Sequence, residues 1–399
     1  MRGLLKASAG IQAASVLTLI LQNLMAPRLM GAASYGRAVA LMALPLLLQG
    51  VIEPMVNGVA ITARSRSDRF RIVRESLTYL GLLLLPVAAL TLAYGIERRA
   101  TTWQLVLLGS FVVLVMVNTA LRGLAFAGRR HGLLVAHFVA AGFATVATLP
   151  FLVLFETTGY LAMMCLVQAT VLGVLLGDRE LRTEVASTLA EQHGSGGTFD
   201  FMRICAANLA PRAAQVALGP GMLLLASVQL EAVRLAEFRV AQTFAGALSY
   251  ALPLHPTLIQ AHASSAGAVA ANPGSSEVRS FVRLFILSAG LAMVETLALW
   301  LVYPWGTAFL LKRDVVTYEF RSMIWAAPFF ALSPAISGLL LGTGSERVVL
   351  LVNLLLIPAS AAVGVRYGAA AGFAGGSVAL GCALGIAAWW CYKKVCFGR

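Results

Sequence analysis

Long apolar stretches separated by short polar segments follow one another along nearly the whole chain. A lipid hydrocarbon core of about 30 Å is crossed by about 20 residues of α-helix. Twelve stretches come close to this length or exceed it, so the pattern predicts an all-α integral membrane protein and not a secreted domain behind a signal peptide. The predicted spans are residues 7–27, 38–62, 77–95, 103–127, 132–154, 159–177, 204–228, 239–260, 281–303, 322–342, 347–365 and 369–391.

The longest interruption between spans follows the sixth one. Residues 178–203 are charged in their first half, and their second half contains Gly-Ser-Gly-Gly at 194–197, which is typical of a flexible linker. We therefore predict a six-helix lobe at 1–177, a cytoplasmic inter-lobe linker at 178–203 and a second six-helix lobe at 204–399.

The two halves resemble each other. A shift of 202 residues superposes Arg37 on Arg239, at the start of spans two and eight, and Pro54 on Pro256. Six spans per half keep the two repeats in the same orientation, related by an axis along the membrane normal. The expected fold is thus two pseudo-symmetric six-helix lobes around a central cavity.

Composition and charge agree with a membrane location. Hydrophobic residues make up 59% of the chain and charged residues 12%, whereas a soluble domain carries about 25% charged residues. The net charge of +13 would suggest nucleic-acid binding in a soluble protein, but 18 of the 30 Lys and Arg fall on one side of the predicted membrane. The positive-inside rule then predicts that both termini are cytoplasmic, and no nucleic-acid partner is expected.

Polar groups inside the spans indicate surfaces that face water or a substrate, because a charge at the bilayer centre costs about 2.5–3.5 kcal/mol. Arg212 follows Pro211 inside the seventh span, and we expect it to line the cavity. The alternatives are snorkelling to the membrane surface or a structural ion pair. Snorkelling explains Arg122, near the cytoplasmic end of span four, equally well. Further candidate cavity residues are Asn208, Gln215, Gln22 and Asn23.

Glu53 and His255 each precede one of the two superposed prolines. Because histidine titrates near neutral pH, the pair is a candidate for ion coupling, with the two side chains facing each other across the cavity. The alternatives are a buried polar contact that locks the halves together, or two residues near the cytoplasmic ends of their helices.

No nucleotide, metal or other cofactor site is expected. The chain lacks a G-x-x-x-x-G-K-[ST] motif, and its five cysteines show neither C-x-x-C spacing nor a neighbouring histidine cluster.

Glycines recur every four residues at Gly368, Gly372 and Gly376, and again at Gly381 and Gly385. Small residues at this spacing predict close helix packing in lipid.

Two local motifs carry a resemblance to a known family. Residues 29–36 (Leu-Met-Gly-Ala-Ala-Ser-Tyr-Gly) resemble the L-G-x-x-x-Y-G turn after the first helix of polysaccharide (O-antigen) flippases, which belong to the multidrug/oligosaccharidyl-lipid/polysaccharide (MOP) exporter superfamily. Residues 354–358 (Leu-Leu-Leu-Ile-Pro) and 367–372 (Tyr-Gly-Ala-Ala-Ala-Gly) are similar to the pattern of that family's last two helices. Glu53 lies where an acidic segment is usual, but its spacing departs from the family pattern.

The resemblance implies a transporter of the bacterial cytoplasmic (inner) membrane that acts in polysaccharide or lipopolysaccharide biosynthesis. Its lobes would rock around a cavity lined by spans one, two, seven and eight. The implied substrate is an oligosaccharide on a polyprenyl diphosphate, which is flipped to the outer leaflet. Arg212, Arg37 and Arg239 would attract the diphosphate. Membrane lipids, polysaccharide polymerase and chain-length proteins are the implied partners.

Three alternatives stay open. A lipid II flippase of the same superfamily is one, although that branch usually has fourteen spans. A cation-coupled multidrug antiporter of the same superfamily often has an acidic cation site in its first helix, which this chain lacks. A membrane enzyme of polysaccharide assembly needs a positioned acid or base, usually on a sizeable outward loop. The longest outward segment, residues 304–321, shows no recognisable catalytic arrangement, so we expect a protein that is not an enzyme.

Overall fold

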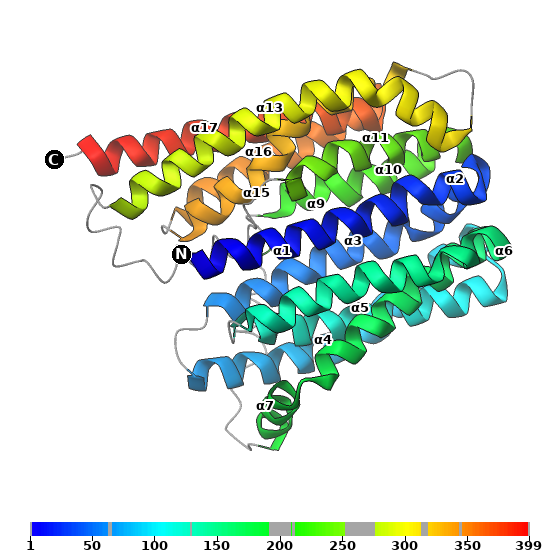
Figure 1. Cartoon of the computed structure of the whole chain (residues 1–399), viewed down its shortest axis with the longest axis horizontal. Coiled ribbons are helices and arrows are strands. Elements are labelled where there is room, and N and C mark those ends of the chain that lie inside the picture. The colour runs from blue at the N-terminus through cyan, green and yellow to red at the C-terminus, as the bar shows by residue number, and fades with distance from the viewer. Residues whose placement is uncertain are drawn as a thin grey trace. The chain divides into compact units, whose positions relative to one another are not determined.

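In a computed structural model the chain is built of helices (Figure 1). The structure describes residues 2–62, 66–127, 130–190, 209, 212–251, 276–312, 318–342 and 345–397. Within these ranges every regular element is helical and no strand occurs. The predicted all-α fold is confirmed.

Nine helical segments of the described residues are long and apolar enough to cross a membrane. They are Gly10–Met30, Ala32–Glu53, Leu80–Glu97, Thr102–Ala125, Gly132–Gly177, Phe285–Leu311, Ser322–Leu340, Arg347–Tyr367 and Ala369–Trp390. Residues Ala213–Gln229 form a shorter apolar helical segment, and helix α11 (Ala232–Ala251) follows it. The protein is a multi-pass membrane protein.

One of the nine segments holds two of the predicted spans. Gly132–Gly177 has 46 residues, which would measure about 69 Å as a straight helix, more than twice the hydrocarbon core. It is broken at Glu156, whose φ of 45° and ψ of −119° are not helical. Gly159 follows, and a Cβ there would lie 1.9 Å from the carbonyl oxygen of Phe151. The chain therefore reverses between the predicted spans 132–154 and 159–177.

The surface of the helices shows where lipid lies. Along α13 (Ser276–Leu311) the large apolar side chains Ile286, Leu287 and Val294 are each at least 64% exposed. Contiguous apolar surface of this kind is not left open to water in a soluble monomer. The opposite face of α13 carries the buried Ser288, Thr296 and Thr307, so the helix is apolar toward lipid and polar toward the interior of its unit.

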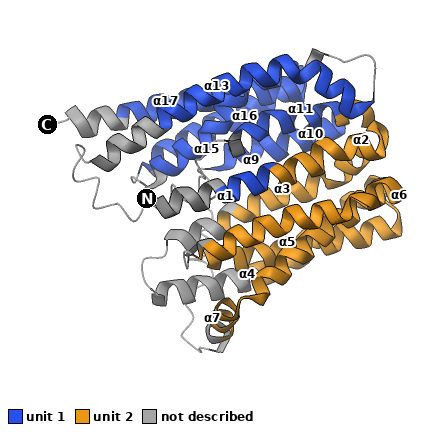
Figure 2. Ribbon diagram, in the orientation of Figure 1, with its two compact units in different colours: residues 1–16, 210–229, 237–399 blue, residues 17–209, 230–236 orange. Residues whose placement is uncertain are grey.

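The described helices form two compact units (Figure 2). Unit 1 comprises residues 1–16, 210–229 and 237–399, and unit 2 comprises residues 17–209 and 230–236. Helices α1 (Arg2–Leu19) and α11 each contribute to both units. The lobe and linker boundaries predicted from the sequence stay a prediction.

Unit 2 is a bundle in which α3 contacts α4, α5 and α6, and α5 lies between α4 and α6 (Figure 1). A short helix, α7, packs on α4, α5 and α6 through Leu181, which joins a buried apolar cluster with Leu121, Leu124 and Leu175. The elements are η1 (Ile20–Met25), α2 (Ala26–Met30), α3 (Ala32–Thr62), α4 (Arg66–Glu97), α5 (Thr102–Ala127), α6 (His131–Gly177) and α7 (Arg179–Ala190).

In unit 1 the last helix, α17, contacts α10, α14, α15 and α16. A Cβ at Gly372 would lie 2.8 Å from the Cα of Gly364, and one at Gly381 would lie 2.7 Å from the Cβ of Phe329. The predicted close packing is confirmed at Gly372, Gly376 and Gly381. The elements are α9 (Ala213–Val216), η3 (Ala217–Gly221), α10 (Met222–Gln229), α11, α13, η5 (Tyr318–Arg321), α14 (Ser322–Trp325), α15 (Ala327–Gly342), α16 (Glu346–Tyr367) and α17 (Ala369–Phe397).

Gly368 and Gly385 differ from the other glycines of that series. A Cβ at either would meet no atom within 4 Å. Gly368 ends α16 with a φ of 94°, a conformation that glycine adopts at little cost. Gly368 therefore makes the turn between the last two spans. The four-residue spacing had suggested that it packs these helices together, and this prediction is wrong. Gly31, with a φ of 85°, makes the corresponding turn between spans one and two.

Candidate functional site

The first span of each half is interrupted by a π-helical turn. In unit 2 the turn is η1, and Pro27 follows it. In unit 1 the turn is η3, and Pro220 lies within it. A π-turn widens the helix and leaves backbone groups without their usual partners, and such turns are frequent at functional sites. Interrupted helices are also where transporters commonly bind their substrates.

The predicted cavity residues Gln22 and Asn23 lie on η1 itself. The Gln22 amide donates to Thr145 Oγ1 of α6 at 3.1 Å. Asn23 is buried, donates to the carbonyl oxygen of Leu19 at 3.3 Å, and accepts from the Tyr35 hydroxyl of α3 at 3.3 Å. Both amides therefore bind within unit 2 and hold the interrupted helix against its neighbours.

The position of Arg212 is set by α9, the short helix of the seventh span that begins at Ala213. Arg212 is half-buried and lies at the N-cap position of α9. The Oδ1 atom of Asn353, on α16, accepts from the backbone N–H of Ala214 at 2.8 Å. A free N–H at a helix start needs such a partner, so the buried Asn353 fixes the turn that carries Arg212. Gln215 donates to Ser337 Oγ at 3.5 Å, and Asn208 lies outside the described residues.

The two superposed arginines have different surroundings. Arg37 is exposed at the start of α3. Arg239, on α11, is half-buried and donates from Nη1 to the Gln242 Oε1 atom at 2.7 Å. Gln242 in turn donates to the carbonyl oxygen of Gly219 in η3 at 2.8 Å. The sequence predicted Arg239 but not Gln242, which joins it to the π-turn.

Close packing of α3 explains a glycine of the family-like turn. A Cβ at Gly36 would lie 1.7 Å from the carbonyl oxygen of Ala232, within unit 2. Any side chain there would force two backbone segments apart. Tyr35, beside it, is fully buried and stacks edge-on against Tyr160 at a centroid distance of 5.7 Å.

Glu53, a predicted coupling residue, forms an ion pair within unit 2. Its Oε1 atom lies 2.9 Å from Nη2 of Arg122 on α5. One turn earlier on α5, the Asn118 amide donates to both the side chain and the backbone carbonyl of Gln168, each at 2.8 Å. His255 lies outside the described residues, so its pairing with Glu53 stays a prediction.

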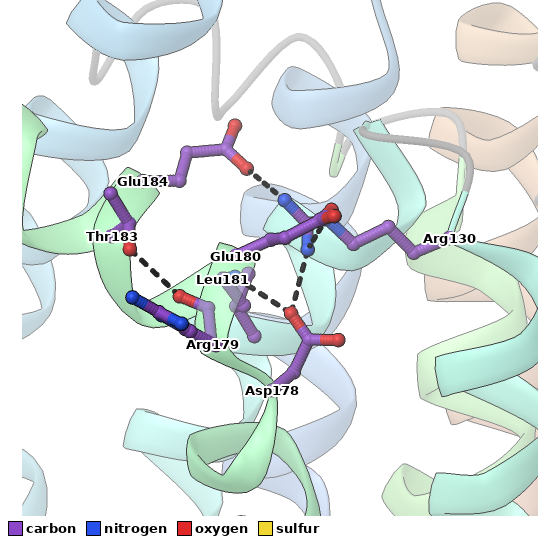
Figure 3. Close-up of polar contacts among 7 residues, drawn as sticks. All are labelled: Arg130, Asp178, Arg179, Glu180, Leu181, Thr183 and Glu184. Atoms are coloured by element: carbon purple, nitrogen blue, oxygen red, sulfur yellow. Dashed lines mark hydrogen bonds and ion pairs between the residues drawn. The ribbon is translucent and has the colours of Figure 1, made fainter.

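A second polar cluster lies where α6 ends and α7 begins (Figure 3). Arg130 Nη1 contacts Asp178 Oδ1 at 2.7 Å and Glu180 Oε2 at 3.3 Å, and its Nη2 contacts Glu184 Oε2 at 3.0 Å. Asp178 also accepts from the backbone N–H of Leu181 at 2.7 Å, as an N-cap does. Arg130 thereby ties the first part of the predicted linker to the α5–α6 connection.

One buried carboxylate escaped the sequence analysis. Glu237, on α11, is only 2% exposed, although it lies just before the predicted start of span eight. Its burial shows that α11 enters the interior earlier than hydropathy indicates, and only the run of apolar residues around it hinted at this. Among the described residues, no group of three or more His, Cys, Asp or Glu is arranged to hold a metal ion.

No protein-family model matches the chain, and no curated protein matches it. Solved structures match it over its whole length. An inward-facing multidrug resistance MATE family transporter of the MOP superfamily gives a TM-score of 0.67 at 14% identity, covering 99% of this chain and 94% of that chain. The eukaryotic MATE transporter AtDTX14 gives 0.68 at 14%, covering 98% and 97%. The lipid II flippase MurJ, inward closed, gives 0.66 at 9%, covering 98% and 89%. The chain has the fold of these proteins.

Proposed function

We propose that this protein is a MOP-superfamily membrane transporter that flips a polyprenyl-diphosphate-linked oligosaccharide from the cytoplasmic to the outer leaflet by alternating access. The fold supports transport, since the matching structures are transporters and a flippase and cover nearly the whole chain. In this proposal the two six-helix lobes move relative to each other, and the protein performs no bond chemistry.

The charge along the interrupted spans supports an anionic cargo. The first span, Gly10–Met30, carries amides and a basic residue but no Asp or Glu. The half-buried Arg212 lies at the N-cap of α9, shortly before η3 in the sequence, and the half-buried Arg239 on α11 is joined to η3 through Gln242. A guanidinium binds phosphate oxygens in a two-pronged geometry and stays charged at every physiological pH. These two half-buried arginines on the spans that adjoin the π-turn are the observation on which the choice of a diphosphate carrier rests.

The ion pair of Glu53 argues against this residue as the coupling site of a drug antiporter. A cation site needs a carboxylate that is not already neutralised, whereas Glu53 lies 2.9 Å from Arg122. The MATE transporters match the fold as well as MurJ does, so the test has to measure both activities.

Purified protein in liposomes tests the proposal. A fluorescent polyprenyl-diphosphate oligosaccharide is placed in one leaflet, and its arrival in the other is followed by a quencher that cannot cross the membrane. We expect flipping above the rate of empty liposomes, and at least tenfold slower flipping for Arg212→Ala, about the effect of one lost charged hydrogen bond. Arg366→Gln, which removes an exposed arginine from α16, is the matched control and should flip normally.

Three results would overturn the proposal. Flipping at the rate of empty liposomes would remove the activity itself. Gradient-driven movement of ethidium without glycan flipping would establish the drug antiporter instead. A chemically altered glycan after incubation would establish an enzyme.

In cells, we expect the protein in a bacterial inner membrane with both termini inside, beside polysaccharide polymerase and chain-length proteins.

A further inference from the structure

A chain of hydrogen bonds in unit 1 leads from Arg239 to the π-turn of the seventh span. Arg239 donates to Gln242 Oε1, and Gln242 Nε2 donates to the carbonyl oxygen of Gly219. Gln242 is 5% exposed, so its amide has little access to water as a replacement partner. Both ends of one buried amide are thus occupied, one by the cation and the other by the backbone of the turn.

The π-turn is a mechanically weak point in its helix. Pro220 lies inside η3 and has no N–H to give to the preceding turn. Helices bend where prolines and π-turns interrupt the hydrogen-bond ladder. The Gly219 carbonyl oxygen accepts from the N–H of Met222 and also from Gln242. The contact from α11 therefore stabilises the helix at the place where it is easiest to bend.

Unit 2 has a comparable contact between its first two spans. There the Tyr35 hydroxyl of α3 contacts Asn23 of η1, and Asn23 contacts the Leu19 carbonyl oxygen. In each unit, then, the helix that follows the interrupted span contacts its π-turn: α3 contacts η1, and α11 contacts η3. Arg37, which the repeat superposes on Arg239, is exposed and takes no part in the contacts to η1. In unit 1 the chain of contacts reaches the guanidinium of Arg239.

We propose that Arg239 and Gln242 form a substrate-sensing relay that releases the η3 turn when an anionic diphosphate binds. A guanidinium bonds more strongly to phosphate oxygens than to a neutral amide. Binding therefore draws Arg239 away from Gln242, the Gln242 side chain loses its orienting partner, and the Gly219 carbonyl oxygen loses its contact. Arg239 touches the cargo in this scheme, and Gln242 is a positioning residue. The relay rests on the proposed diphosphate cargo.

Hydrogen exchange of the full-length protein in nanodiscs tests the relay without requiring transport. The amides of residues 213–229 are followed with and without farnesyl diphosphate as the probe, with farnesol as the control that lacks phosphate. We expect faster exchange with the diphosphate only, by about fivefold, the factor for losing one neutral hydrogen bond. Gln242→Leu should exchange at the faster rate without the probe, and Arg239→Gln should not respond to it.

A matched variant separates the relay from general loss of stability. Gln104→Leu removes another buried glutamine, which contacts Thr158 in unit 2, and should leave residues 213–229 unchanged. If the wild-type protein binds farnesyl diphosphate but the exchange of these residues does not change, the relay is wrong and the proposed cargo stands. If the wild-type protein does not bind the diphosphate at all, the proposed cargo fails and the relay fails with it.

Discussion

Glu53 and Arg122 form an ion pair of 2.9 Å that joins helices α3 and α5 inside unit 2. The two side chains are unequally buried, with 37% of Glu53 and 12% of Arg122 exposed. In a bilayer an unpaired charge is expensive, and charged residues inside spans therefore pair with one another. The pair explains how both residues are tolerated within apolar helices.

The unequal burial predicts an unequal cost of breaking the pair. Glu53→Ala leaves the buried Arg122 without its carboxylate and should destabilise unit 2 by about 2–3 kcal/mol. Arg122→Ala leaves Glu53, which is more exposed and lies at the end of the apolar segment Ala32–Glu53, and should cost about 1 kcal/mol. Melting temperatures in detergent, followed by the monodisperse fraction, measure the order of the two variants.

The double variant is the control for this prediction. Removing both charges leaves no unpaired ion, so Glu53→Ala combined with Arg122→Ala should melt at a higher temperature than Glu53→Ala alone. Melting of Glu53→Ala at the wild-type temperature, or additive losses in the double variant, would show that the contact contributes no stability.

This ion pair also shows what the sequence could not predict. The internal repeat suggested His255 as the partner of Glu53, because a sequence shows which positions of the two halves are equivalent. The partner Arg122 lies 69 positions away on a helix of the same half. The lengths of the apolar runs predicted where the spans lie. Helices that are apolar on nearly every face give no signal of which side turns inward, so the rotation of each helix about its axis could not be predicted. The same limit hid Gln242 and Asn353, whose roles depend on which backbone group they face.

Arg130 is expected to hold α7 on the bundle. Arg130→Ala removes the common partner of Asp178 and Glu184, whose contacts measure 2.7 and 3.0 Å. We predict faster hydrogen exchange of residues 179–190 in this variant. One molar salt should have a smaller effect in the same direction, because it screens partly buried charges incompletely.

Variants of the three carboxylates separate the contributions at this site. Glu180→Ala should change nothing, since the Glu180 side chain is 85% exposed. Asp178→Asn keeps a good N-cap and loses only the charge, whereas Asp178→Ala loses both and should cost about 1–2 kcal/mol. Equal exchange in Asp178→Asn and Asp178→Ala would contradict the N-cap to Leu181.

The glycines of the last span permit a sharp packing test. A Cβ at Gly372 would meet backbone atoms, the Gly364 Cα at 2.8 Å and the Ser360 carbonyl oxygen at 2.9 Å. Backbone cannot rotate away, so Gly372→Ala should separate α16 from α17 and lower the melting temperature strongly. Gly375→Ala, where a Cβ meets nothing within 4 Å, should melt like the wild type. Wild-type melting of Gly372→Ala would show that the two helices lie farther apart.

The glycine spacing predicted helix packing better than the charged residues predicted their partners, because the spacing depends only on the geometry of one helix. Spacing of four residues places side chains on one face of a helix, and that face packs whatever the neighbour is. It failed at Gly368, where backbone conformation and not packing requires glycine, and at Gly385, where a Cβ would meet no atom within 4 Å. Sequence spacing cannot distinguish a residue at a turn from one in the adjoining helix when both are small.

The break at Glu156 predicts a specific pattern of labelling across the membrane. Forty-six apolar residues are too long for one crossing, so Gly132 and Glu180 should lie inside and Glu156 outside. In a cysteine-free background, Glu156→Cys on intact cells should react with a maleimide that cannot cross the membrane. Gly132→Cys, at a glycine with no atom within 4 Å of a Cβ, and Glu180→Cys should react only after permeabilisation. Labelling of Gly132→Cys and Glu180→Cys on opposite sides would mean a single tilted crossing. Labelling of Glu156→Cys only after permeabilisation would invert the proposed orientation, and with it the side from which the cargo enters.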